Sequence, residues 1–183
     1  MQKIVISVVG TDRPGIVAAV ARILFDHNCN IENVSQTIQQ GEFAALFIAT
    51  AAEGFQQENL LAQLQAGLKP LGLEVLLKPL SPPQLDNPIA ASSFVVTTTG
   101  SDRPGLVAGI SEMLARYQVN ITNLRAVFRG GDDPSGNIMI YEVDVPVTVD
   151  FKEFRQALRQ RARDLGLDLN VQHRDIFESI HRI

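Results

Sequence analysis

The stretch Gly10–Asn33, GTDRPGIVAAVARILFDHNCNIEN, has a counterpart at Gly100–Asn123, GSDRPGLVAGISEMLARYQVNITN. The chain has 183 residues, so the motif returns after about half of its length, which indicates two domains of similar build. A domain of roughly 90 residues is small but large enough to fold around its own core. The sequence therefore predicts a tandem pair of small domains.

The segments around the first copy have a regular order. An apolar, β-branched run at Ile4–Val9 predicts a strand, and apolar residues after GTDRPG recur at helical spacing up to Leu24. Two strands at Ile31–Gln39 and Phe43–Ala49 form a hairpin, a leucine stripe gives a second helix, and Leu73–Leu80 is a last strand. The predicted order is βαββαβ.

The second half repeats this order. Its expected strands are Phe94–Thr99, Ile121–Arg129, Ile138–Val145 and Leu167–Gln172, and its expected helices are Leu106–Tyr117 and Phe151–Leu165. Asp150 is placed to cap the last helix, with Glu153 three residues later as in a capping box. The proline-rich segment SPPQLDNP predicts a linker at 81–91 between a first domain at 1–80 and a second at 92–183, which includes a short C-terminal tail.

A βαββαβ order predicts an α+β fold of two ferredoxin-like domains, each an antiparallel sheet with both helices on one face. The expected strand order, 4-1-3-2, leaves the second strand at an edge of each sheet. Because an unpaired edge favours unwanted association, we expect Asn30–Gln39 and Asn120–Arg129 to pair with one another about a pseudo-twofold axis.

Charge and composition exclude several classes of function. The net charge is −4, with five basic and eight acidic side chains in residues 1–90 and eleven and twelve in 91–183, so neither half has the basic excess of a DNA-binding domain. The one basic run, Arg155–Arg163, is most simply a solvated helix face. No apolar run is long enough to span a membrane, and the start does not resemble a signal peptide. With the lone Cys29, this predicts a cytoplasmic protein that binds neither nucleic acid nor membrane.

The turn before each predicted helix has a purely structural explanation. In it a glycine permits a tight turn, an aspartate caps the helix, and a proline occupies the first helical turn, where its missing N–H costs nothing. The residues concerned are Gly10, Asp12 and Pro14 in the first copy and Gly100, Asp102 and Pro104 in the second.

The repeated asparagines at the next strand start favour a binding role, because asparagine is a poor strand former. They are Asn30 and Asn33 in the first copy and Asn120 and Asn123 in the second. A helix start with a glycine in its first turn exposes backbone N–H groups to a carboxylate, and the aspartate beside it can take an ammonium group. Since neither a P-loop lysine nor GxGxxG accompanies the turn, a free amino acid is favoured over a nucleotide.

The expected topology constrains such a site. The first and second strands of a βαββαβ domain run parallel, so the turn lies at one end of the sheet and the asparagines at the other. One half cannot close the site alone. We therefore expect the Asp12 turn to meet Asn120 and the Asp102 turn to meet Asn30, which gives two pockets.

The motif G-x-D-R-P-G-[IL]-V-A followed by N-I-x-N resembles that of an ACT domain, and the tandem pair, which covers nearly the whole chain, is similar to the glycine cleavage system transcriptional repressor family. The resemblance implies a ferredoxin-like sensor that binds a small amino acid where two modules meet. It also implies a protein partner, a DNA-binding activator. The implied ligand-binding residues are Asp12, Arg13, Pro14, Gly15, Asn30, Asn33, Asp102, Arg103, Pro104, Gly105, Asn120 and Asn123.

No set of catalytic or metal-ligating residues stands out. The histidines are His27, His173 and His181, and their spacing supplies neither a zinc site nor a triad. His27 suits a helix C-terminus and Cys29 a small buried position. The residues Asp132, Asp133 and Ser135 are compatible with a cation, although a turn is the simpler interpretation.

We therefore expect a regulatory amino-acid sensor that is not an enzyme and needs no cofactor or metal. The alternative is a structural or dimerisation module whose GxDRPG turns only build the fold. The sequence does not decide which amino acid binds or whether two chains form a homodimer.

Overall fold

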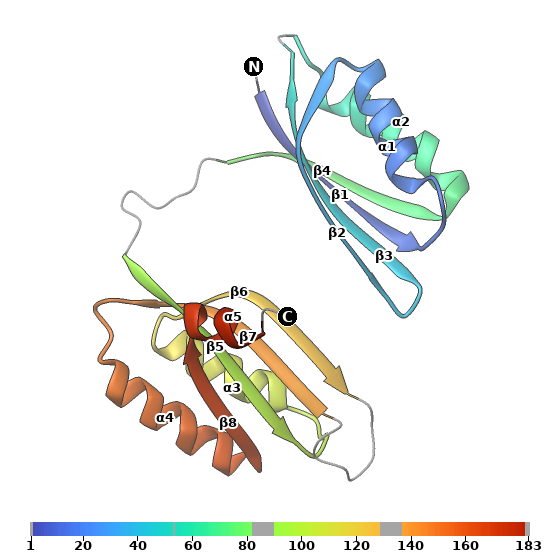
Figure 1. The fold of residues 1–183 in the computed structure, drawn as a ribbon. Helices are drawn as coiled ribbons and strands as arrows, with labels where there is room; N and C mark the ends of the chain where they lie inside the picture. Colours follow the sequence, from blue (N-terminus) through green and yellow to red (C-terminus); the bar gives the residue numbers. More distant parts are fainter. Residues whose placement is uncertain (1, 53, 82–89, 129–136, 182–183) are drawn as a thin grey trace. The chain divides into compact units, whose positions relative to one another are not determined.

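The computed structural model describes residues 2–52, 54–81, 90–128 and 137–181. The chain divides into two compact units, Met1–Asp86 and Asn87–Ile183 (Figure 1). The linker predicted from the prolines is largely outside the described residues, since 82–89 are not described. The Gly130–Gly136 loop, with Asp132, Asp133 and Ser135, also lies outside them.

Each unit has the predicted βαββαβ order. The first consists of β1 (Gln2–Thr11), α1 (Ile16–Asp26), β2 (Cys29–Gln39), β3 (Glu42–Ala51), α2 (Gln57–Leu68), a short 3-10 turn η1 (Lys69–Leu71) and β4 (Leu73–Pro79). The second consists of β5 (Ala91–Gly100), α3 (Leu106–Arg116), β6 (Asn120–Phe128), β7 (Asn137–Pro146), α4 (Phe151–Asp164), β8 (Leu167–His173) and α5 (Arg174–His181). The sequence predicts only a short tail in the place of α5, because this helix is short and follows β8 without any turn residue.

The sheets have the strand orders β2-β3-β1-β4 and β6-β7-β5-β8, with neighbouring strands antiparallel. This confirms the predicted 4-1-3-2 order and places β2 and β6 at an edge of their sheets. How the two edges lie relative to one another is not described, so their pairing stays a prediction.

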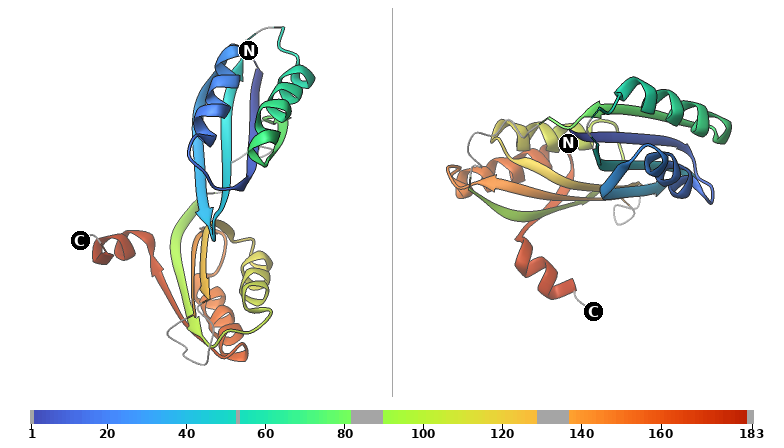
Figure 2. Two further views of the ribbon diagram at one scale, coloured as in Figure 1. Left: turned by 90° about the vertical axis from the view of Figure 1, so that its right-hand side faces the viewer. Right: turned by 90° about the horizontal axis from the view of Figure 1, so that it is seen from above.

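The core of each unit lies between one face of the sheet and a pair of helices. In the first unit Ile4, Ile6 and Val8 alternate along β1 and are fully buried against α1 and α2, which present Leu24 and Leu64. In the second unit α3 and α4 lie together on one side of the sheet, whereas α5 lies on the other (Figure 2). Each sheet therefore has one face covered by its two core helices; we call the opposite face the open face, and in the second unit α5 lies on that side.

Gly10 and Gly100 are required for a reason different from the tight turn that we expected. Each stands near the end of a strand, where the start of the neighbouring edge strand passes very close. A Cβ on Gly10 would lie 2.6 Å from the Gly72 carbonyl oxygen, and one on Gly100 would lie 2.6 Å from Leu167 Cδ2 and 2.9 Å from the Gly166 carbonyl oxygen. These glycines allow two backbones to approach.

We predict that Gly100→Ala lowers the free energy of unfolding of the second unit by about 1–3 kcal/mol, because the added methyl group overpacks the β5–β8 contact. Urea unfolding followed by circular dichroism measures the change. Ser101→Ala, at the exposed next position, is the control and should change stability by less than about 0.5 kcal/mol. Equal stability of the two variants would contradict the close approach.

Candidate functional site

The turn before α1 and before α3 ends in a glycine with a left-handed backbone. Gly15 has φ 97° and Gly105 has φ 91°, and both are N-caps whose carbonyls accept the first helical hydrogen bond. A Cβ at either position would meet no atom within 4 Å, so conformation and not space demands glycine there. Both glycines lie one residue before the helix and not, as expected, in its first turn. The space into which a side chain would project from them is open.

The predicted helix caps are wrong. Neither α1 nor α3 has a side-chain cap, and Asp12 and Asp102 stand three residues before the N-cap glycine with exposed side chains. Pro14 and Pro104 also precede the N-cap and are outside the first helical turn. The physical reason is that the glycine, with its left-handed backbone, occupies the N-cap position, so the aspartate lies too early in the chain to be the N-cap.

A capped helix in the same chain shows the contrast. At the start of α4 the Asp150 carboxylate accepts hydrogen bonds from the backbone N–H groups of Lys152, at 2.9 Å, and Glu153, at 3.0 Å. The free N–H groups of the first turn of α1 and α3 have no such side-chain acceptor. Both helix starts therefore offer donors and the positive end of a helix dipole to an anion.

The charged side chains of the two turns differ in their contacts. The backbone N–H of Asp12 donates to the Gly41 carbonyl oxygen at 2.8 Å, which fixes the turn to the β2–β3 hairpin. Within the part of the chain that the structure describes, the Asp12, Arg13 and Asp102 side chains make no hydrogen bond or ion pair. Arg103 instead donates from Nη2 to the Asp164 carbonyl oxygen, at 3.3 Å, at the end of α4.

The N-I-x-N motif forms a β-bulge at the start of β2 and at the start of β6. The register shifts between Ile31 and Asn33 in β2, and at the corresponding point in β6, so one extra residue, Glu32 or Thr122, has no partner in the ladder. The pairs around the first bulge are Asn30 with Thr50, Ile31 with Ala49 and Asn33 with Ile48.

The bulge decides where the asparagines face. Residues three apart in a regular strand point to opposite faces, but the extra residue brings Asn30 and Asn33 onto the same face. Ile31 pairs with Ala49, which is fully buried in the core, so the asparagines lie on the open face. The bulge in β6 likewise brings Asn120 and Asn123 onto the open face of the second sheet, and all four asparagines are exposed. Sequence reasoning missed the bulge, although the repeated three-residue spacing was its signal.

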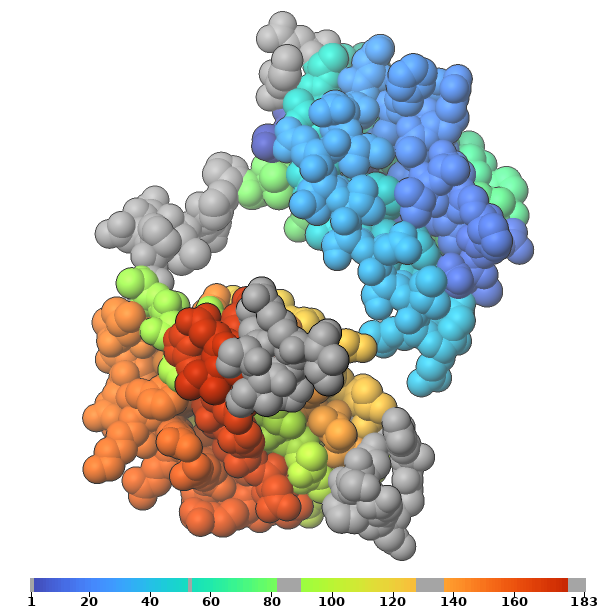
Figure 3. Space-filling view, viewed as in Figure 1, coloured from blue at the N-terminus to red at the C-terminus, as the bar shows by residue number. Residues whose placement is uncertain are grey.

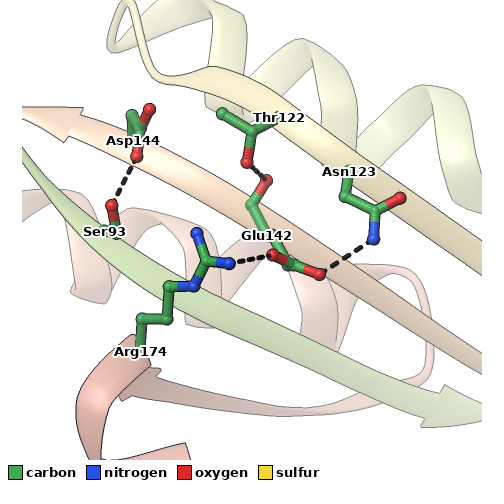
Figure 4. Close-up of polar contacts among 6 residues, drawn as sticks. All are labelled: Ser93, Thr122, Asn123, Glu142, Asp144 and Arg174. Carbon is green, nitrogen blue, oxygen red and sulfur yellow. Dashed lines mark hydrogen bonds and ion pairs between the residues drawn. The ribbon is translucent and has the colours of Figure 1, made fainter. Parts of the chain in front are cut away.

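In the second unit Asn123 belongs to a polar network that the sequence did not predict (Figure 4). Its Nδ2 donates to Glu142 Oε1 at 2.8 Å, and Glu142 Oε2 forms an ion pair with Arg174 of α5 at 3.4 Å. On the same two strands, Thr122 donates to the Glu142 carbonyl oxygen at 3.2 Å. Beside this network Ser93 donates to Asp144 Oδ1 at 2.7 Å. Asp144 pairs with Asn120 in the ladder, so a second carboxylate belongs to the residue opposite Asn120.

The corresponding edge of the first unit has different chemistry. The bulge residue Glu32 accepts hydrogen bonds from Thr50 and from Lys3, whose Nζ lies 2.6 Å from Oε2. These two hydrogen bonds hold the pKa of Glu32 below its ordinary value. Asn33 faces Ile48 here, where Asn123 faces Glu142 in the second unit.

Within one unit the turn and the asparagines are far apart. β1 and β2 both pair antiparallel with β3, where Gly10 pairs with Phe43 and Asn30 pairs with Thr50 at the opposite end. This agrees with the predicted topology. The meeting of the Asp12 turn with Asn120, and of the Asp102 turn with Asn30, is not described and stays a prediction.

The other candidate residues have structural positions. His27 is the C-cap of α1, as expected. Cys29 is buried, which raises the pKa of its thiol, and its Sγ lies 3.6 Å from the His27 carbonyl oxygen. Among residues 2–52, 54–81, 90–128 and 137–181, no group of three or more His, Cys, Asp or Glu side chains is arranged to hold a metal ion. No helix in this part of the chain is long and apolar enough to cross a membrane.

Two ferredoxin-like modules, each with an uncapped helix start and an exposed asparagine pair, define the class of protein as a tandem small-domain protein with two repeated candidate binding surfaces. The ACT domain profile matches residues 2–78 and again 92–172. The chain therefore belongs to the ACT domain family, whose members are regulatory domains that bind amino acids.

Curated relatives match about half of the chain. A UPF0237 protein of Methanococcus maripaludis is 35% identical over 91 residues, which are 50% of this chain and 98% of that protein. A UPF0237 protein of Methanopyrus kandleri is 37% identical over 90 residues, 49% of this chain and 96% of that protein. Each of these relatives is therefore about the size of one module.

Solved structures match both modules together. The crystal structure of an unknown protein from Galdieria sulphuraria has a TM-score of 0.74 at 22% identity, covering 94% of this chain and 98% of that one. A structure described as a candidate glycine cleavage system transcriptional repressor has a TM-score of 0.64 at 22% identity, covering 93% of this chain and 96% of that one. At this identity the two likenesses show the fold.

We predict that Asp150→Ala lowers the free energy of unfolding by about 1 kcal/mol through the loss of two cap hydrogen bonds. Asp102→Ala should change it by less than about 0.5 kcal/mol, because its side chain caps nothing. Chemical unfolding of both variants measures the difference. If Asp102→Ala costs as much as Asp150→Ala, the aspartate has a structural role after all.

Proposed function

We propose that this protein is a regulatory sensor of a small amino acid, bound at the GxDRPG turns and the asparagine pairs. The observation that carries the proposal is the uncapped, open start of α1 and α3, repeated in both modules together with an exposed asparagine pair on a bulge. Membership of the ACT domain family supports it, because ACT domains bind amino acids.

The chemistry of the two surfaces fits the two ends of an amino acid. The first-turn N–H groups next to Gly15 and Gly105 suit a carboxylate. The amide oxygens of Asn30 and Asn120 suit an ammonium group, and so do the carboxylates of Asp12 and Asp102, which have no described side-chain partner. The open space over each glycine would admit a ligand close to the backbone.

A ligand that uses both surfaces needs two modules. Within one unit the turn and the asparagines stand at opposite ends of the sheet, as the ladder of β3 with β1 and β2 requires. We therefore assign each site to the turn of one module and the asparagine pair of another. Whether the other module comes from the same chain or from a second chain of a homodimer is part of the test.

The regulatory output is proposed to be transcriptional and to act through a partner protein, a DNA-binding activator, in glycine or amino-acid metabolism. The similarity to a structure described as a candidate glycine cleavage system repressor supports this choice. The acidic net charge of −4 disfavours direct binding to DNA. The lone cysteine supports action in a reducing compartment such as the cytoplasm.

The alternative is a module whose turns only build the fold. It predicted a lost helix cap on substitution of Asp12 or Asp102, and the structure shows no such cap. Exposed aspartates without described side-chain partners contribute little to folding, so the binding proposal explains them better.

We predict that at least one of the twenty amino acids raises the melting temperature of the wild-type protein. A ligand at 100 times its dissociation constant stabilises the folded protein against unfolding by about 2.7 kcal/mol. Asn120→Ala and Asn30→Ala should weaken binding tenfold or more without changing the melting of the free protein, because neither side chain has a described partner. Asn59→Ala, an exposed asparagine of α2, is the matched control. No shift with any amino acid would contradict the proposal.

A double-mutant cycle on the binding free energy tests the assignment of the two sites. We predict that Asp12→Ala and Asn120→Ala are strongly non-additive, because both residues serve one ligand, whereas Asp12→Ala and Asn30→Ala add independently. Isothermal titration calorimetry gives the four affinities of each cycle. The reverse pattern would join the Asp12 turn to Asn30 of a second chain and overturn the assignment of Asp12 to Asn120.

A further inference from the structure

The C-terminal helix α5 stands on the open face of the second sheet. Figure 2 shows it on the side opposite to α3 and α4, projecting away from the strands. In the space-filling view its atoms, in red, lie in front of the second unit (Figure 3). Phe177 lines a recess with Thr97, Ile140 and Asn170, and Arg174 forms the ion pair with Glu142. The described side-chain contacts of the helix therefore include Arg174 and Phe177.

Glu142 connects this helix to an asparagine of the candidate site. One carboxylate oxygen accepts from Asn123 Nδ2 at 2.8 Å, and the other lies 3.4 Å from Arg174 Nη2 (Figure 4). The two oxygens of one rigid carboxylate thus hold a binding-surface residue and the first residue of α5. Asn123 and Arg174 are thus connected through a single side chain.

The first module shows that the fold does not require this link. The position of Glu142 in β7, opposite Val95, corresponds to that of Ile48 in β3, opposite Val5. Asn33 faces Ile48 and makes no described side-chain hydrogen bond. The same backbone thus forms with an apolar residue at this position, so the Asn123–Glu142–Arg174 link is a special property of the second module.

We propose that α5 is the output element of the sensor and that Glu142 couples it to ligand binding at Asn123. A ligand that takes the Asn123 amide withdraws it from Glu142, the carboxylate loses the hydrogen bond that orients it, and α5 loosens at Arg174. This inference rests on the proposed function for its ligand. It identifies Glu142 as a positioning residue that does not touch the ligand.

The strength of the contact suits such a switch. Arg174 and Glu142 have side chains 46% and 30% exposed, and an ion pair of that exposure changes an equilibrium by no more than about fivefold. A small difference in ligand affinity between the attached and loosened states is then enough to shift the population of α5. By linkage, loosening α5 must in turn change the ligand affinity.

The test follows hydrogen exchange of the α5 backbone amides in the full-length protein. Glu142→Ile, which copies the first module, and Arg174→Gln should each raise exchange in α5 severalfold in the ligand-free protein. Arg159→Gln, an exposed arginine of α4, is the control and should leave α5 unchanged. Unchanged exchange in both Glu142→Ile and Arg174→Gln would overturn the link.

The second arm adds glycine, alanine or serine as the probe. With a probe that binds, α5 exchange should rise severalfold in the wild type and not rise further in Glu142→Ile, whose probe affinity should also change severalfold. A bound probe that leaves α5 exchange unchanged would overturn the coupling while the proposed function stands. If no probe, nor any other amino acid, shifts the melting temperature, the proposed function fails and the ligand response with it.

Discussion

One extra residue in each of the edge strands β2 and β6 determines what the open faces of this protein can bind. The bulge in N-I-x-N changes the phase of the strand, so that the isoleucine stays over the core while the asparagines on both sides of it face outward together. Without the bulge, one asparagine of each pair would point toward the helix-covered face, where an unpaired amide is costly. The paired asparagines, the exposed polar edge and the network around Glu142 all depend on this register shift.

The two modules share their backbone and differ in the chemistry that they place on it. Both have a left-handed glycine at the helix start and a bulge at the strand start. The first module holds Glu32 with Lys3, whereas the second places Glu142 and Asp144 beside its asparagines and links Glu142 to Arg174. A duplicated fold has thus acquired two non-equivalent surfaces, and only the second, among the residues described, is connected to a terminal helix.

The sequence predicted the strand order and the helices because their apolar periodicity is strong and is repeated. It did not predict the N-cap role of Gly15 and Gly105, because an aspartate three residues earlier looks equally suitable for a cap. Bulges and cross-strand contacts such as Asn123 with Glu142 depend on the register between strands that are distant in the chain. The sequence of one strand does not contain this register, so neither feature was predicted. The helix α5 was missed because eight residues without a start signal are too few to establish a period.

In the proposed function a free amino acid contacts the backbone at the start of α1 or α3 and the side chains of the asparagine pairs. An NMR titration of the ¹⁵N-labelled protein with the amino acid tests this most directly. We expect the largest shifts on the backbone amides that follow Gly15 and Gly105 and on the side-chain amides of Asn30 and Asn120. Shifts confined to α2 and α4, or saturating binding that leaves those amides unmoved, would contradict it.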